Sequence, residues 1–113
     1  MNLLTHALRQ QLLANGLASQ EQERDHIPVV KLFTPDANAT WLLTEIDPED
    51  PDRAFGLCDL GLGCPELGYV SLAELATYRG PLGLHIERDR HFAASDPLTV
   101  YADEARRHGR IVT

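Results

Sequence analysis

Residues 40–72 read TWLLTEIDPEDPDRAFGLCDLGLGCPELGYVSL and hold the only tryptophan and both cysteines of the chain. Residues 40–46 are apolar on both alternating faces, which is typical of a strand in the middle of a sheet. Residues 54–60 predict a further strand, and residues 64–70 predict another after the tight turn at 61–63. Because the connections are short, we expect these strands to pair with antiparallel neighbours.

The connection at residues 47–53, DPEDPDR, contains two prolines and four acids. Proline cannot donate a backbone hydrogen bond to a neighbouring strand. Charged side chains are rarely buried unless they are paired. We therefore expect residues 47–53 to form an exposed connection between two strands.

The residues before this region predict one helix and one strand. Thr5 is placed to cap a short amphipathic helix, and Asn15-Gly16 is placed to end it. Residues 18–26 are polar and show little periodicity, so we expect a loop there. Residues 28–34 carry apolar side chains on two alternating faces and predict a strand.

The residues that follow predict a helix and then a strand at the edge of the sheet. Ser71 and Glu74 have the spacing of a capping box, which predicts a helix that ends near Tyr78. Residues 82–92 alternate with a period of two. One face of this segment carries charged and histidine side chains, so we expect an edge strand with one side in water.

A last helix is expected near the C-terminal end of the sequence. Asp96 is placed as its N-cap, with Pro97 at the first helical position and Gly109 at its end. The elements together predict an α+β fold. It would have a four- or five-stranded, mostly antiparallel sheet with an N-terminal helix and two later helices. We expect residues 1–113 to form a single domain.

Composition narrows the possible functions. The 113 residues carry a formal net charge of -7 with a pI near 5.0, which argues against direct binding to nucleic acid or to an anionic membrane. No apolar run reaches the roughly 20 residues of a membrane helix. The N-terminus lacks the unbroken apolar segment of a signal peptide. We expect a cytoplasmic protein whose cysteines are reduced, with no cofactor.

The acids are concentrated in one part of the chain. Residues 35–74 contain nine acids and one base, Arg53, so this segment is more negative than the whole chain. Such a segment can simply keep a protein soluble, or it can bind a basic partner. We expect a binding face for a protein partner, basic or itself nucleic-acid-binding, with Trp41 and Phe55 as hydrophobic anchors where they are exposed. Its residues are Asp36, Trp41, Glu45, Asp47, Glu49, Asp50, Asp52, Asp59 and Glu66.

An alternative assigns some of the same acids to catalysis. Asp47, Asp59 and Glu66 follow or begin predicted strands, where their oxygens could converge on Mg²⁺. Two ions held by carboxylates can cleave a phosphodiester, so this alternative is a metal-dependent phosphodiesterase or nuclease. The three residues have no distinctive spacing. The sequence therefore favours a binding role over an enzymatic one and assigns no catalytic or metal-binding residue.

The cysteines and histidines give a weaker signal. Cys58 and Cys64 are separated by five residues, which is wider than the usual spacing in a zinc site. His85 or His91 could complete a zinc site only if the strand at 82–92 lay beside the two cysteines. We expect the cysteines to act as small apolar residues and the histidines to face water.

Three segments resemble a known group of proteins. They are KLFTPDANATWLLTE at 31–45, FGLCDLGLGCPELGYVSLAEL at 55–75 and IERDRHF at 86–92. The chain resembles small, single-domain proteins of unknown function in proteobacteria, often encoded on plasmids and integrated elements. The resemblance implies a bacterial protein with an accessory role in a mobile element. It implies no catalytic residue, so the expected function stays a protein-binding module.

Overall fold

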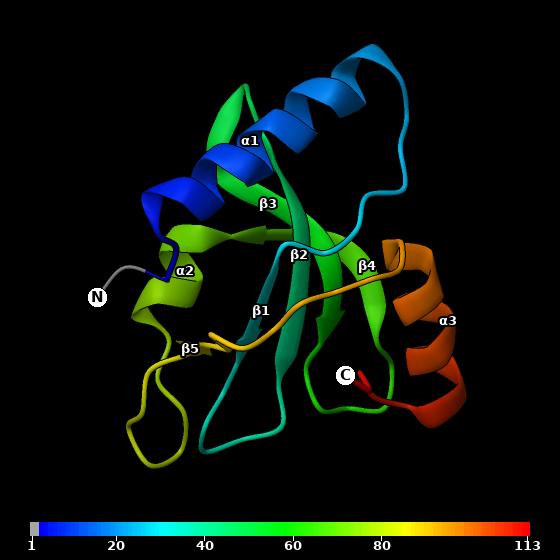
Figure 1. Ribbon diagram of the computed structural model, residues 1–113. Coiled ribbons are helices and arrows are strands. Elements are labelled where there is room, and N and C mark those ends of the chain that lie inside the picture. The colour runs from blue at the N-terminus through cyan, green and yellow to red at the C-terminus, as the bar shows by residue number, and fades with distance from the viewer. Residues whose placement is uncertain (1–2) are drawn as a thin grey trace.

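A five-stranded antiparallel sheet forms the centre of the computed structural model, which describes residues 3–113 (Figure 1). The order of the strands is β4-β3-β2-β1-β5, and three helices accompany them. The α+β class and the two later helices are therefore confirmed. The strands are β1 (Val30–Phe33), β2 (Thr40–Asp47), β3 (Asp50–Asp59), β4 (Glu66–Ser71) and β5 (Glu87–Arg88), and the helices are α1 (His6–Glu21), α2 (Leu72–Thr77) and α3 (Leu98–His108).

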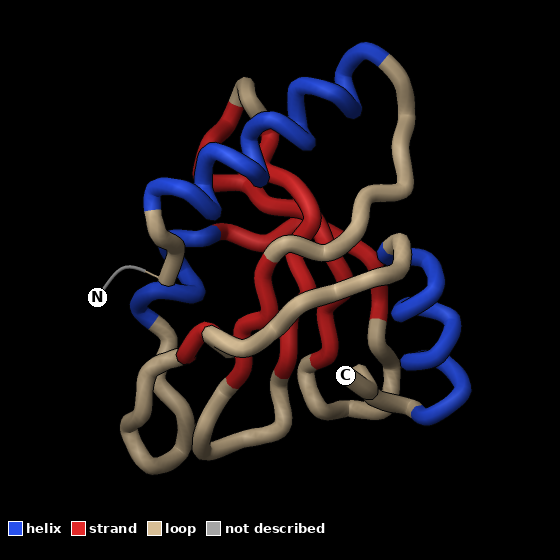
Figure 2. Tube along the Cα trace, in the orientation of Figure 1, coloured by secondary structure: helices blue, strands red, loops and turns tan. Residues whose placement is uncertain are grey.

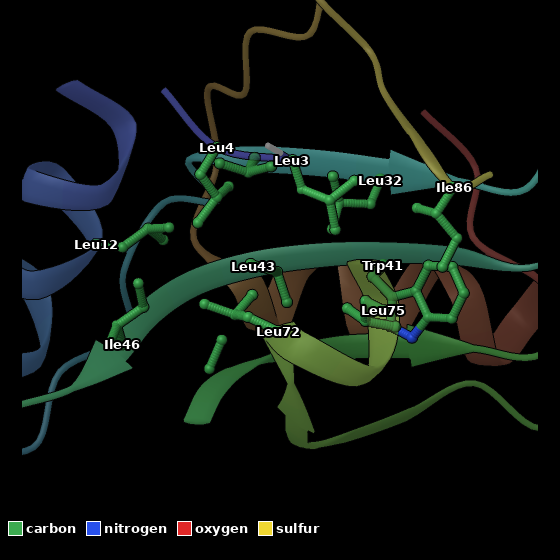
Figure 3. Close-up of a cluster of buried hydrophobic side chains, with 12 residues drawn as sticks. Leu3, Leu4, Leu12, Leu32, Trp41, Leu43, Ile46, Leu72, Leu75 and Ile86 are labelled. Carbon is green, nitrogen blue, oxygen red and sulfur yellow. The ribbon is translucent and has the colours of Figure 1, made fainter. Parts of the chain in front are cut away.

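The sheet has a hydrophobic core on each face, because its central strand β2 is apolar on both. Trp41 and Leu43 enter the core beneath α1, together with Leu12 of that helix (Figure 3). Leu42 enters the second core, where it packs with Leu57 and with α3. The expectation that β2 is the central strand is correct. Helices α1 and α3 pack on the two different cores and so lie on opposite faces of the sheet (Figure 2).

Helix α1 begins as predicted and ends later than predicted. The hydroxyl of Thr5 accepts a hydrogen bond from the Leu8 N–H over 3.1 Å, so Thr5 is the N-cap. Gly16 does not end the helix, which continues to Glu21 and includes the first part of the expected loop at 18–26. A Cβ at Gly16 would lie 1.9 Å from the Ile46 carbonyl oxygen. This glycine lets the helix backbone approach β2 closely.

The acidic connection predicted at 47–53 is mostly strand, so its prediction as a loop is wrong, while residues 49–53 are exposed as expected. Asp47 pairs with Asp50, so only Pro48 and Glu49 form the turn between β2 and β3. Pro51 is tolerated inside β3 because β4 pairs with β3 only from Arg53 onward. The two strands therefore extend beyond the rest of the sheet as a hairpin.

The predicted strand at 82–92 is reduced to β5, which lies at the edge of the sheet as expected. Before it, the chain forms a loop around Asp36. The Asp36 carboxylate accepts hydrogen bonds from the N–H groups of Leu82, over 2.8 Å, and Leu84, over 3.3 Å. These backbone donors bond a side chain, so they are not available to a neighbouring strand.

Helix α3 is capped from a distant part of the chain. The prediction that Asp96 caps it is wrong, because Pro97 holds the N-cap position and provides no side-chain bond. Asp25, from the loop after α1, accepts the Thr99 N–H over 3.2 Å. Gly109 ends the helix in a left-handed conformation, as predicted. Within residues 3–113, none of the helices is long and apolar enough to cross a membrane.

Candidate functional site

The end of the β2–β3 hairpin carries the densest charge of the molecule's sheet. Residues 45–53 contain five acids and one base, a net charge of -4 within nine residues. The turn brings the acids of both strands to one end, which we call the acidic hairpin end. Its acids are Glu45, Asp47, Glu49, Asp50 and Asp52.

Two of these acids bond backbone N–H groups in the turn and beside it. Asp47 accepts the Glu49 N–H over 2.9 Å, and Asp50 accepts the Asp52 N–H over 3.3 Å. Aspartate favours turns because its short side chain can bond a backbone donor two residues later. Such bonds hold the carboxylates of Asp47 and Asp50 in place, and Asp50 keeps its charge at the exposed surface.

Asp52 joins the hairpin to helix α2. Its carboxylate accepts the Ser71 hydroxyl over 2.6 Å and the Ala73 N–H over 2.8 Å. These two bonds hold the pKa of Asp52 below its ordinary value. Ser71 also accepts the Glu74 N–H over 3.2 Å, so the predicted N-cap is confirmed and Asp52 extends it.

The lowered pKa makes the contribution of Asp52 to stability depend on pH. A carboxylate whose pKa is lower in the folded state stabilises the protein above its unfolded pKa, near 3.8, and loses this effect as the pH falls further. We expect Asp52→Asn to reduce the free energy of unfolding at pH 7 and to reduce it much less at pH 2.5. Urea unfolding at both pH values measures the difference, and a pH-independent loss would contradict this account.

A small acidic notch lies beside the hairpin, where it meets α1 and the edge strand β4. Its volume is about 260 Å³. Three carboxylates line it, and the ring of Tyr69 lines it as well. The residues of the acidic notch are Gly16, Ser19, Gln20, Glu45, Asp47, Pro48, Glu49 and Tyr69.

Tyr69 is an exposed aromatic residue held in place by two neighbours. Its ring lies 5.0 Å from that of Phe55, edge to face, and the Arg53 guanidinium stacks 3.7 Å from its centre. Both contacts fix the orientation of the ring and leave 55% of the residue exposed. Sequence reasoning did not select Tyr69, although its alternation with Leu67 on the predicted strand at 64–70 places the two on one face.

Glu45 is positioned by a hydrogen-bonded chain from α1. The Ser19 hydroxyl donates to the Glu45 carboxylate over 3.2 Å and lies 2.9 Å from Nε2 of His26. A hydroxyl has one proton, so Ser19 must accept from His26 when it donates to Glu45. In a serine nucleophile the histidine accepts this proton. The arrangement therefore orients Glu45 and does not activate Ser19.

The other predicted binding residues do not join the acidic hairpin end. Trp41 is 4% exposed and belongs to the core, so it does not meet the condition of exposure for a surface anchor. Asp36 holds the loop before β5, and Phe55 is half buried against the core beneath α3. Glu66 is exposed at the start of β4, opposite Cys58. The nine predicted residues thus do not form one face.

The carboxylates of the metal-dependent alternative are far apart. Asp47 lies at the turn, while Asp59 pairs with Thr40 at the other end of β2, about 23 Å away along the strand. Asp59 is 3% exposed, and its oxygens accept the N–H groups of Gly61 and Ile111, each over 2.9 Å. Across residues 3–113, no group of three histidine, cysteine or acidic side chains is placed to hold a metal ion. The geometry therefore contradicts the proposed convergence.

The cysteines do not lie beside the two histidines considered for a zinc site, because β2 and β1 separate β3 and β4 from β5. Cys58 is half buried, and burial, with a smaller effect from the charge of Glu66, raises its thiol pKa to about 11. At neutral pH this thiol stays protonated and is a poor nucleophile or metal ligand. Cys64 is exposed in the turn before β4, and His85 and His91 are exposed beyond the opposite edge of the sheet.

A second hollow, of about 650 Å³, lies at the opposite end of the sheet. The charged side chains that line it are two bases and two acids: Lys31, Arg110, Asp59 and Asp89. Lys31 lies 3.8 Å from the Asp89 carboxylate and donates to the Thr113 hydroxyl over 2.6 Å. The charges in this hollow are balanced within the chain, so it has no net charge with which to select a ligand.

Comparison with known proteins gives a family. Residues 3–112 match the model of a family described as Protein of unknown function (DUF2958). No curated protein and no solved structure matches the chain. The match covers nearly the whole length that the structure describes.

Proposed function

We propose that this chain, which belongs to the DUF2958 family of proteins of unknown function, is a protein-binding module. Its acidic hairpin end would dock on a basic partner. The observation that supports the proposal most directly is the gathering of five carboxylates at one end, with Arg53 as the only base between residues 45 and 53. A surface of one sign attracts partners of the opposite sign and orients their approach.

The shape of this end suits binding better than catalysis. Its carboxylates are spread over the two strands and the turn, and two of them already bond backbone N–H groups of the hairpin. The pKa of Asp52 is lowered, and a carboxylate with a lowered pKa is a poor proton donor or acceptor near neutral pH. These features agree with a charged docking surface.

Tyr69 takes the role that we expected of Trp41. Binding surfaces usually combine a few exposed aromatic or arginine side chains with a charged rim. Tyr69 and Arg53 are both exposed and stack on each other beside the acidic notch. The bacterial cytoplasm and the accessory role in a mobile element, which the sequence resemblance implied, are the setting that we propose for this binding.

The proposal predicts which charges control affinity for a basic ligand. A labelled oligolysine peptide is the probe, and fluorescence anisotropy at low ionic strength measures its affinity. Each exposed ion pair contributes about 0.5 kcal/mol, so the triple variant Glu45→Gln, Asp47→Asn, Glu49→Gln is expected to bind about tenfold more weakly. The difference should largely vanish at molar salt, because salt screens exposed charges.

A matched control separates this site from the net charge of the chain. The variant Glu87→Gln, Asp96→Asn, Asp103→Asn removes three exposed acids elsewhere and has the same net charge. We expect its affinity to fall less than about threefold. If both variants lose affinity equally, binding follows net charge alone and the proposed site is wrong.

A further inference from the structure

We infer that the exposed edge of β4 receives an extended basic segment of the partner as a sixth strand of the sheet. The inference rests on the proposed function and specifies its binding mode. It follows from three features of β4: its unpaired backbone, its exposed apolar side chains and its position beside the acidic notch.

The outer edge of β4 has the properties of a strand that can accept another. β4 is the terminal strand and pairs only with β3, in a register without a bulge. Its six residues, ELGYVS, contain no proline and no lysine, the residues that usually protect an edge. Within residues 3–113, no backbone hydrogen bond joins residues 67–70 to anything but β3. The outward N–H and C=O groups of β4 are therefore available for a further strand.

The exposed apolar side chains of β4 would pack against the side chains of an added strand. Leu67 is 37% exposed and Tyr69 is 55% exposed, and alternation places both on the same face. On the other face, Gly68 has open space where a side chain would stand, since a Cβ there would meet nothing within 4 Å. A neighbouring strand commonly covers such an edge glycine with a large side chain.

The negative charge around β4 favours a basic segment as the added strand. Glu66 begins β4, and the acidic notch, with Glu45, Asp47 and Glu49, adjoins its Tyr69. A strand beside β4 that carried lysine or arginine would place its charges between these carboxylates. A second copy of this chain would instead bring another molecule of charge -7 to the same edge. The complementary occupant is an extended segment that mixes basic and apolar residues.

Backbone methylation of a peptide directly tests whether the peptide adds to β4 as a strand. The probe is a short capped peptide that alternates lysine with valine, and two further versions are N-methylated at odd or at even positions. In an added strand, only alternate N–H groups point toward β4. We expect one methylated version to bind about tenfold more weakly or worse, because it loses two or three hydrogen bonds, and the other to bind nearly as well as the parent peptide.

The outcomes separate the two proposals. Equal affinity of both methylated peptides, combined with sensitivity to the notch carboxylates, would overturn strand addition and leave the acidic docking surface intact. Equal affinity without that sensitivity would overturn both. Sedimentation of the chain alone tests the competing occupant. A dimer that the peptide dissociates would assign the β4 edge to a second copy and would also overturn the inference.

Discussion

Replacing Gly56 by alanine is expected to lower the free energy of unfolding by about 3 kcal/mol. A Cβ at this position would lie 1.9 Å from the Leu42 carbonyl oxygen and 2.9 Å from the Leu43 Cα. Both atoms belong to the backbone of β2, so no side-chain rotation relieves the overlap. The two central strands would have to separate, and urea unfolding would measure the loss.

The cross-strand partner of Gly56 provides a matched control. Gly68 faces Gly56 in the register of β3 and β4, and a Cβ there would meet nothing within 4 Å. We expect Gly68→Ala to leave stability unchanged or to raise it by about 0.5 kcal/mol, because alanine has less conformational freedom in the unfolded chain. Equal losses for the two variants would show that close approach to β2 is not the reason for Gly56.

The second large effect is expected at Asp59, which the metal-dependent alternative placed in a catalytic site. Its buried carboxylate accepts one N–H from the turn after β3 and one from Ile111 near the C-terminal end. Asp59→Ala leaves the buried Ile111 N–H and the partly buried Gly61 N–H without a partner, and a fully buried unsatisfied donor costs about 1–3 kcal/mol. We expect a total loss of about 3 kcal/mol in the free energy of unfolding.

A conservative variant sharpens the result at this position. Asparagine can keep one acceptor oxygen, but it presents an N–H₂ group to the other donor. Asp59→Asn should therefore lose about half as much stability as Asp59→Ala. The control Asp103→Asn, at an exposed position of α3, should change stability by less than about 0.5 kcal/mol. Unchanged stability in both Asp59 variants would contradict the structural role.

The local patterns of the sequence predict most of the fold. The two-sided apolar pattern of residues 40–46 identified the central strand, and Thr5, Ser71 and Gly109 correctly marked helix ends. These features depend on neighbouring residues, so they can be recognised in the sequence. The fold class followed from the order of the elements.

The errors share a physical cause, because each depends on contacts between distant residues. Gly16 resembles a helix end, but it serves a close approach to Ile46. Residues 82–84 resemble a strand, but Asp36 takes two of their backbone donors. Asp25, and not the adjacent Asp96, bonds the start of α3. Sequence spacing alone does not contain these partners.

The candidate site was predicted in part for the same reason. The acids at 45–52 were selected from their density, and the hairpin brings them to one end. Asp59, Asp36 and Trp41 were selected with them, but Asp59 and Trp41 are buried and Asp36 bonds the loop before β5. Tyr69 was missed because the sequence does not show that β4 lies beside the carboxylates of the acidic notch.

An NMR titration of the isotope-labelled chain with the lysine–valine peptide tests the central claim most directly. The amide shifts report which residues the ligand approaches. We predict that the largest changes lie at residues 45–49 and 66–71, and that they decrease as salt is added. Changes centred on the opposite hollow, at residues 59–63 and 109–111, would contradict a binding site at the acidic hairpin end and the β4 edge.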